Sequence, residues 1–175
     1  EEIADAVLMH TRSRDEANSA EFVAVLEKAT GVWFVGGSQQ KLADAYVGTL
    51  FEERVLALLG RGGVVGGSSA GAAIQSRMMI QSGKTEANIG QGFDLLPGTI
   101  IDQHFSARNR LTRLMGAVDK NPLKVGLGID EQTALLVAGR MMRVVGVGKV
   151  TVCYGKSDKY GLESQQKTYA HGTAL

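Results

Sequence analysis

The sequence is poor in the residue types that cross-link small folds or bind metals. Its 175 residues include one cysteine, three histidines and two prolines. A single cysteine cannot form an internal disulfide, and this set is too small for a zinc site of the usual Cys/His kind. No apolar run approaches the roughly 18 residues of a membrane-spanning helix. The formal net charge of +1 gives no reason to expect nucleic acid or an anionic membrane as a partner.

Glycine is abundant, with 23 residues that cluster between apolar segments. Short apolar runs predict strands over 6–9, 32–35, 63–66, 98–102 and 125–129. Helical periodicity predicts helices over 16–28, 40–59, 70–76 and 106–118, and further strands are expected over 133–137, 141–145 and 150–153. This alternation predicts a single α/β domain over residues 1–175. We expect a mostly parallel sheet with helices on both faces and a C-terminal β meander.

One segment has the pattern of a nucleophile elbow. Gly67-Ser68-Ser69-Ala70-Gly71 fits G-x-S-x-G between a predicted strand and a predicted helix, which is the context that this motif requires. The frame selects Ser69, because Gly71 lies two positions after it, whereas Ala70 follows Ser68 at that distance. The free N–H groups at the start of the helix would face a developing oxyanion. A turn that only packs closely or binds phosphate is the alternative interpretation.

Polar residues follow four of the predicted strands. Gln39, Ser69, His104 and Glu131 each lie just beyond a strand's carboxyl end. In parallel α/β sheets, ligands bind at that edge, so we expect these four side chains to share it.

A serine hydroxyl needs a base to accept its proton. His104 is the natural candidate, because imidazole exchanges protons near neutral pH and the other two histidines lie near the chain start and in the polar tail. The base in turn needs an acid that orients it. Glu131, Asp130 and Asp102 are all candidates, and the residues alone leave the choice between them open.

Three arginines follow His104, namely Arg108, Arg110 and Arg113. Guanidinium binds carboxylate in a bidentate manner, so arginines beside a catalytic histidine favour a substrate that carries carboxylates. The alternative is a solvated helix face, which is the usual place of such charges.

Several segments together resemble the cyanophycinase family of serine peptidases, which is related to aspartyl dipeptidase. They are Val35-Gly36-Gly37-Ser38-Gln39, Gly66-Gly67-Ser68-Ser69-Ala70-Gly71-Ala72, the block from Asp102 to Arg113, and Gly128-Ile129-Asp130-Glu131. The resemblance covers about residues 30–152. It implies a fold similar to class I glutamine amidotransferases. It also implies hydrolysis of cyanophycin, a poly-aspartate with arginine on each side-chain carboxyl, or of related β-Asp peptides, without metal or cofactor.

Carried over residue by residue, the resemblance implies a Ser69, His104 and Glu131 triad. The oxyanion would be held by the N–H groups of Ala70 and Gly37. The implied substrate contacts are Gln39, Asp102, Gln103, Arg108, Arg110 and Arg113. The expected partner is a peptide rich in Asp and Arg, and the family suggests a homodimer. The chain is short for the family, so we expect it to lack an N-terminal strand region and part of the C-terminal end.

Three other functions compete with this hypothesis. One is an aspartyl or isoaspartyl dipeptidase, and another is a binding homologue without catalysis. A glutamine amidotransferase is disfavoured, because those enzymes carry a cysteine at the elbow, whereas Cys153 lies on a late predicted strand.

Overall fold

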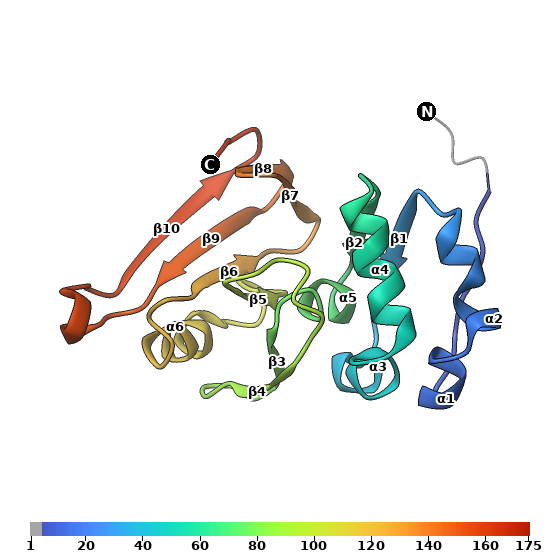
Figure 1. The fold of residues 1–175 in the computed structure, drawn as a ribbon. Helices are drawn as coiled ribbons and strands as arrows, with labels where there is room; N and C mark the ends of the chain where they lie inside the picture. The colour runs from blue at the N-terminus through green and yellow to red at the C-terminus, as the bar shows by residue number, and fades with distance from the viewer. Residues whose placement is uncertain (1–4) are drawn as a thin grey trace. The chain divides into compact units, whose positions relative to one another are not determined.

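The computed structural model describes residues 5–175 and divides into two compact units. The first extends to Gly71, and the second is Ala72–Leu175. Helices lie beside a pair of parallel strands in the first unit, and a four-stranded sheet is the centre of the second (Figure 1). The protein therefore has a mixed α/β fold.

The first unit has short elements joined by capped turns. They are α1 (Arg14–Ala17), α2 (Ala20–Val23), the 3₁₀ helix η1 (Ala24–Glu27), β1 (Gly31–Phe34), α3 (Gln39–Tyr46), α4 (Leu50–Gly60) and β2 (Val64–Gly67), after which comes α5 (Ala70–Ala73). β1 and β2 pair in parallel, with Gly31 opposite Val64 and Phe34 opposite Gly67. Their carboxyl ends therefore finish side by side.

Aromatic side chains form the core of this unit. The rings of Tyr46 and Phe51 have centroids 4.5 Å apart, and the Phe34 ring meets Phe51 edge-on at 6.1 Å. Val55 and Leu58 on α4 are fully buried. Edge-to-face and offset aromatic pairs are favourable beyond their buried area. This packing anchors the end of β1, from which the Gly36-Gly37 loop leaves.

The expected strand over 6–9 is wrong. No regular structure covers it, and Val7 and Leu8 are 60% and 91% exposed. A strand needs a neighbour to satisfy its backbone groups. Within residues 5–175, β1 is paired with β2 alone, and no ladder includes residues 6–9.

The two long helices expected in this unit are each divided. Ser19 interrupts the first, because its Oγ accepts the N–H of Phe22 at 3.2 Å and starts α2 as a new helix. The second breaks at Gly48, whose φ of +72° ends the helical path between α3 and α4. Apolar periodicity continued through both breaks, so it could not reveal them.

The second unit begins with a hairpin and then builds the sheet. Its elements are β3 (Met78–Ser82), β4 (Asn88–Gln91), β5 (Thr99–Gln103), α6 (Leu111–Asp119), β6 (Val125–Ile129), β7 (Thr133–Ala138), β8 (Met141–Gly146), β9 (Lys149–Tyr154), the 3₁₀ helix η2 (Asp158–Tyr160) and β10 (Gln165–Ala170). The sheet order is β10-β9-β6-β5. β5 and β6 are parallel, whereas β6 pairs with β9, and β9 with β10, in antiparallel fashion.

Both faces of this sheet are covered along β5, β6 and β9, whereas the edge strand β10 is largely exposed. Ile100 packs with Leu114 and Cys153 on one face, and its neighbour Ile101 packs with Leu127 on the other. Adjacent residues of a strand point to opposite faces, so β5 is buried along its whole length.

Several features of the second unit differ from expectation. The expected C-terminal meander is divided, because β7 and β8 pair with each other while β9 joins the main sheet. The β3–β4 hairpin and β10 were not predicted. α6 begins at Leu111, not at residue 106, since residues 104–110 form a loop in which His104 and Asn109 have positive φ. Among residues 5–175, no helix has the length and apolarity needed to cross a membrane.

Candidate active site

The elbow motif lies where a sharp turn joins β2 to α5. Ser69 has a φ of +54°, a conformation that a non-glycine residue rarely adopts. The Ser68 N–H continues the parallel ladder by donating to the Phe34 carbonyl at 3.0 Å. The Gly71 N–H then donates to the Ser68 carbonyl at 2.9 Å and closes the turn. Such strain is retained where surrounding structure enforces it, often at functional sites.

Both glycines of the motif are required by close packing. A Cβ on Gly71 would collide with the Phe34 carbonyl, and a Cβ on Gly67 would collide with the Gly71 carbonyl. The first turn of α5 thus lies directly against the end of β1. α5 has four residues, so it offers local N–H groups and little of the dipole of a long helix.

The loop after β1 passes beside this turn. A Cβ on Gly36 would lie 3.5 Å from the Ser69 Cβ, so Gly36 and Ser69 are neighbours. Gly37 has a φ of +137°, which favours glycine. Ser38 caps α3 by accepting the Lys41 N–H at 3.3 Å, which makes Gln39 the first residue of that helix. Gln39, Gly37 and Ser69 therefore belong to the joined carboxyl ends of β1 and β2.

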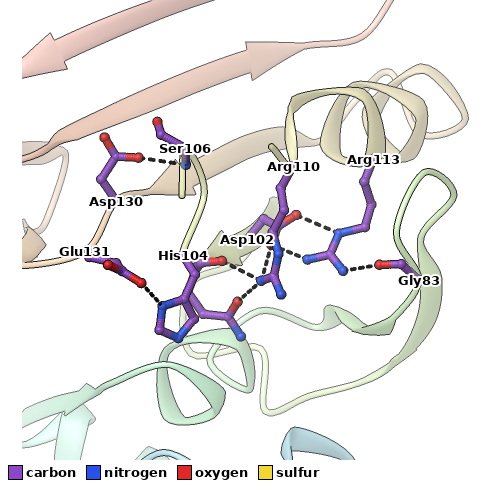
Figure 2. Close-up of polar contacts among 9 residues, drawn as sticks. Gly83, Asp102, His104, Ser106, Arg110, Arg113, Asp130 and Glu131 are labelled. Atoms are coloured by element: carbon purple, nitrogen blue, oxygen red, sulfur yellow. Dashed lines mark hydrogen bonds and ion pairs between the residues drawn. The ribbon is translucent and has the colours of Figure 1, made fainter. Parts of the chain in front are cut away.

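The second unit joins a histidine to a carboxylate in the same way. His104 follows β5 and Glu131 follows β6, the parallel neighbour of β5. His104 Nδ1 lies 2.9 Å from Glu131 Oε1 (Figure 2). Their side chains are 26% and 57% exposed. An ionised carboxylate can only accept, so Nδ1 is the donor and carries the proton.

The other two candidate acids have different partners. Asp130 accepts the backbone N–H groups of Ser106 at 3.0 Å and Lys149 at 3.2 Å. Asp102 is 1% exposed, and its Oδ2 accepts Arg113 Nε at 2.9 Å. Of the three carboxylates, Glu131 is the one that the structure pairs with His104.

Asp102 is the centre of a buried charged cluster (Figure 2). Arg113 is 5% exposed; its Nε and Nη2 both donate to Asp102, and its Nη1 donates to the Gly83 carbonyl. Arg110 Nη1 donates to Asp102 Oδ1 at 3.1 Å and to both the backbone and side-chain oxygens of Gln103. Charged pairs in this fork geometry are strong and directional.

The charges of this cluster do not cancel. Two guanidinium groups surround one carboxylate, which leaves one excess positive charge. Burial is the main cause that lowers the pKa of Arg110 from its ordinary value, with Asp102 opposing and the charges of Arg113 and Arg108 adding to the effect. Arg108 itself is exposed.

An open hollow of about 260 Å³ adjoins the loop after His104. Its lining contains one charged residue, Arg110, and no carboxylate. The lining residues are Phe105, Ser106, Asn109, Arg110, Leu111, Thr151, Gln166 and Thr168. Of these lining residues, the sequence analysis predicted a binding role for Arg110 only. The strand that carries Gln166 and Thr168 shows no clear alternation of polar and apolar residues, so it was not predicted.

The described geometry brings the predicted residues together in two groups. The first unit contains Gln39, Gly37, Ser69 and Ala70. The second contains the His104–Glu131 pair and the expected substrate contacts of the 102–113 block, in which Asp102, Gln103 and Arg113 are buried and Arg108 is exposed. Among residues 5–175, no group of three or more His, Cys, Asp or Glu residues could hold a metal ion.

Comparisons with known proteins agree with the resemblance. A cyanophycinase of Geminocystis herdmanii (strain PCC 6308) is 32% identical over 165 residues, which cover 89% of this chain and 61% of that protein. A cyanophycinase of Synechococcus elongatus is 36% identical over 168 residues, or 90% of this chain and 50% of that protein. The chain thus spans between 50% and 61% of the length of these curated relatives.

A solved structure and a family model extend this finding. The crystal structure of a peptidase from an acI-B1 Actinobacterium matches with a TM-score of 0.70 and 26% identity, covering 93% of this chain and 66% of that one. Residues 6–145 match the model of Peptidase family S51. Since that match includes most of the sequence and contains the elbow, His104 and Glu131, the chain belongs to peptidase family S51.

Proposed function

We propose that this chain carries the active site of a cyanophycinase-like serine peptidase. It would hydrolyse cyanophycin or related β-Asp peptides through an acyl-enzyme. The observation that carries the proposal is the 2.9 Å contact between His104 Nδ1 and Glu131 Oε1 at the joined ends of two parallel strands. A histidine with its Nδ1 proton on a carboxylate presents a basic Nε2 lone pair, which is what a serine nucleophile needs.

In the proposed mechanism, Ser69 is the nucleophile and the His104–Glu131 pair acts as its base. His104 Nε2 accepts the Ser69 proton as Oγ attacks the scissile carbonyl carbon. The N–H groups of Ala70 and Gly37 stabilise the oxyanion. His104 then protonates the leaving amine as the C–N bond breaks. Water, deprotonated by His104, hydrolyses the acyl-enzyme and restores Ser69.

The charges around His104 suit a substrate with carboxylates. We propose that Gln39, Gln103, Arg108 and Arg110 contact the substrate. In cyanophycin each arginine linked to the polymer retains a free carboxylate, and the hollow beside Arg110 contains no acidic side chain to repel it. Asp102 and Arg113 would support this binding indirectly by holding Arg110.

The proposal extends to the architecture. We infer a single peptidase domain over residues 1–175 with a sheet of the class I glutamine amidotransferase type. The two parallel pairs, each ending in site residues, support this inference. The proposed partner is a peptide rich in Asp and Arg, and we expect a homodimer, which light scattering after size-exclusion chromatography would detect.

The decisive experiment is incubation with cyanophycin, with the products identified by mass. We expect β-Asp-Arg dipeptides, and preferential cleavage of free β-Asp dipeptides would instead indicate an isoaspartyl dipeptidase. Ser69→Ala should lower kcat by roughly 10⁴-fold or more and abolish labelling by a fluorophosphonate. Ser68→Ala is the matched control and should retain both. If the wild type showed neither labelling nor turnover, the hypothesis of a binding homologue without catalysis would be favoured.

A further inference from the structure

Asp130 links three segments of the second unit through one side chain. Its Oδ1 accepts the Ser106 N–H at 3.0 Å, in the loop that begins with His104. Its Oδ2 accepts the Lys149 N–H at 3.2 Å, at the first residue of β9. The Asp130 N–H in turn donates to the Lys149 carbonyl at 3.1 Å. The carboxylate next to Glu131 is therefore bonded to the histidine loop through Ser106, as Figure 2 shows, and to the sheet through Lys149.

The turn that carries Glu131 is fixed by further contacts, with Thr133 at the start of β7 and with the chain just before β9. The Val147 N–H donates to the Gln132 carbonyl at 3.1 Å. Thr133 Oγ1 donates to the Glu131 carbonyl at 2.9 Å. Gly148 packs so closely that a Cβ there would lie 2.9 Å from the backbone carbonyl oxygen of Glu131. The Glu131 side chain is 57% exposed, so its place depends on this backbone and not on burial.

The loop that carries His104 depends on the same region. The Phe105 N–H donates to the Ile129 carbonyl at 3.1 Å, and the next N–H, of Ser106, reaches Asp130. His104 itself has a φ of +54°. A strained residue retains such a conformation only where its surroundings enforce it. Two consecutive N–H donors to the end of β6 provide that enforcement.

We propose that Asp130 is a positioning residue that sets the distance between Glu131 and His104. This inference rests on the proposed function, in which that pair prepares the base for Ser69. The Asp130 carboxylate accepts the backbone N–H groups of Ser106 and Lys149, and it transfers no proton in the proposed mechanism. It acts by holding the backbones on either side of the pair, so that an exposed carboxylate and a partly exposed imidazole meet in one geometry.

The test compares three variants. Asp130→Asn keeps one acceptor oxygen, and Asp130→Ala keeps none. The matched control is Asp119→Asn, because Asp119 also accepts a backbone N–H, that of Lys156 at 2.9 Å, and the Ser164 hydroxyl at 2.7 Å. Asp119 lies at the end of α6, away from the His104 loop in sequence, and belongs to the same unit.

We expect kcat to fall by about 10- to 100-fold in Asp130→Asn and further in Asp130→Ala, while KM changes by less than about threefold. Asp119→Asn should retain kcat even if it lowers the melting temperature. An equal loss of kcat in the control, or wild-type kcat in folded Asp130→Ala, would overturn the proposal. If the alanine variant does not fold, the asparagine variant alone decides.

A second measurement does not need turnover. The ¹⁵N shifts of the His104 ring report which nitrogen carries the proton, and the sequence has only three histidines to assign. We expect the Nδ1–H form in the wild type and in Asp119→Asn, and a tautomer mixture in both Asp130 variants. An unchanged ring in those variants would contradict the positioning role. An inert wild type that still shows these shifts would refute the peptidase function while supporting the role of Asp130.

Discussion

At the scale of single residues, the structure separates side chains that the sequence placed in one class. Three arginines follow His104 within a dozen residues, and a shared role in substrate binding was the expectation for all of them. Arg113 is 5% exposed with all three nitrogens bonded inside the protein, whereas Arg108 is exposed. The difference arises because Arg113 faces the buried Asp102 from α6. These two arginines should therefore respond differently to substitution.

Arg113→Ala should destabilise the protein by about 3–5 kcal/mol, because it leaves a buried carboxylate without its bidentate partner. Arg108→Ala, at an exposed position, should change stability by less than about 0.5 kcal/mol. Urea unfolding of both variants measures these effects. If Arg113→Ala were fully stable and only its KM were higher, the result would support a direct contact between Arg113 and the substrate.

The buried Cys153 thiol should make the free energy of unfolding decrease at alkaline pH. Burial, with a smaller contribution from Asp102, raises the pKa of this thiol to about 11. Above pH 9 the unfolded chain loses the thiol proton while the folded chain keeps it, so the free energy of unfolding falls as the pH rises. Between pH 8 and pH 10 the wild type should lose about 1 to 1.5 kcal/mol more than Cys153→Ala. Parallel pH profiles for the two proteins, measured by urea unfolding under reducing conditions, would contradict this prediction.

At the scale of elements, the turns decide where the site residues lie. The elbow joins β2 to α5 only because Gly71 permits α5 to touch the Phe34 carbonyl at the end of β1. Likewise, a loop follows β5, so that α6 begins only at Leu111 and His104 lies at the end of the strand. The short strands and helices are common elements, whereas these two turns are specific to the site.

Gly71→Ala should therefore lower stability and remove fluorophosphonate labelling, since the new Cβ would collide with backbone that cannot move aside. Gly116→Ala is the matched control, because Gly116 lies inside α6 with open space around it. There the same change should stabilise the protein by roughly 0.5–1 kcal/mol through helix propensity. Thermal unfolding and labelling of both variants test the prediction, and a labelled, stable Gly71→Ala would refute it.

At the scale of the whole molecule, the question is whether the two compact units fold together. The sequence offers one reporter in each, because its single tryptophan is Trp33 and its single cysteine is Cys153. If residues 1–175 form one domain as proposed, denaturation should be cooperative. Trp33 fluorescence and the reactivity of the buried Cys153 thiol should then change at the same urea concentration. Two separate midpoints would show two independently folding units.

The sequence alone predicted the chemistry that we propose for the site and the local context of its residues. The elbow motif selected Ser69, and the apolar runs predicted the strands at 32–35, 63–66, 98–102 and 125–129 to within a residue or two. Residue types and spacing could not choose among Asp102, Asp130 and Glu131, a choice that only the family resemblance implied, and they could not recognise Arg113 as buried. Those distinctions depend on which backbone N–H or guanidinium faces each carboxylate, and such contacts join residues far apart in the chain. Periodicity reports which face of an element is apolar, and only tertiary packing decides which polar groups meet.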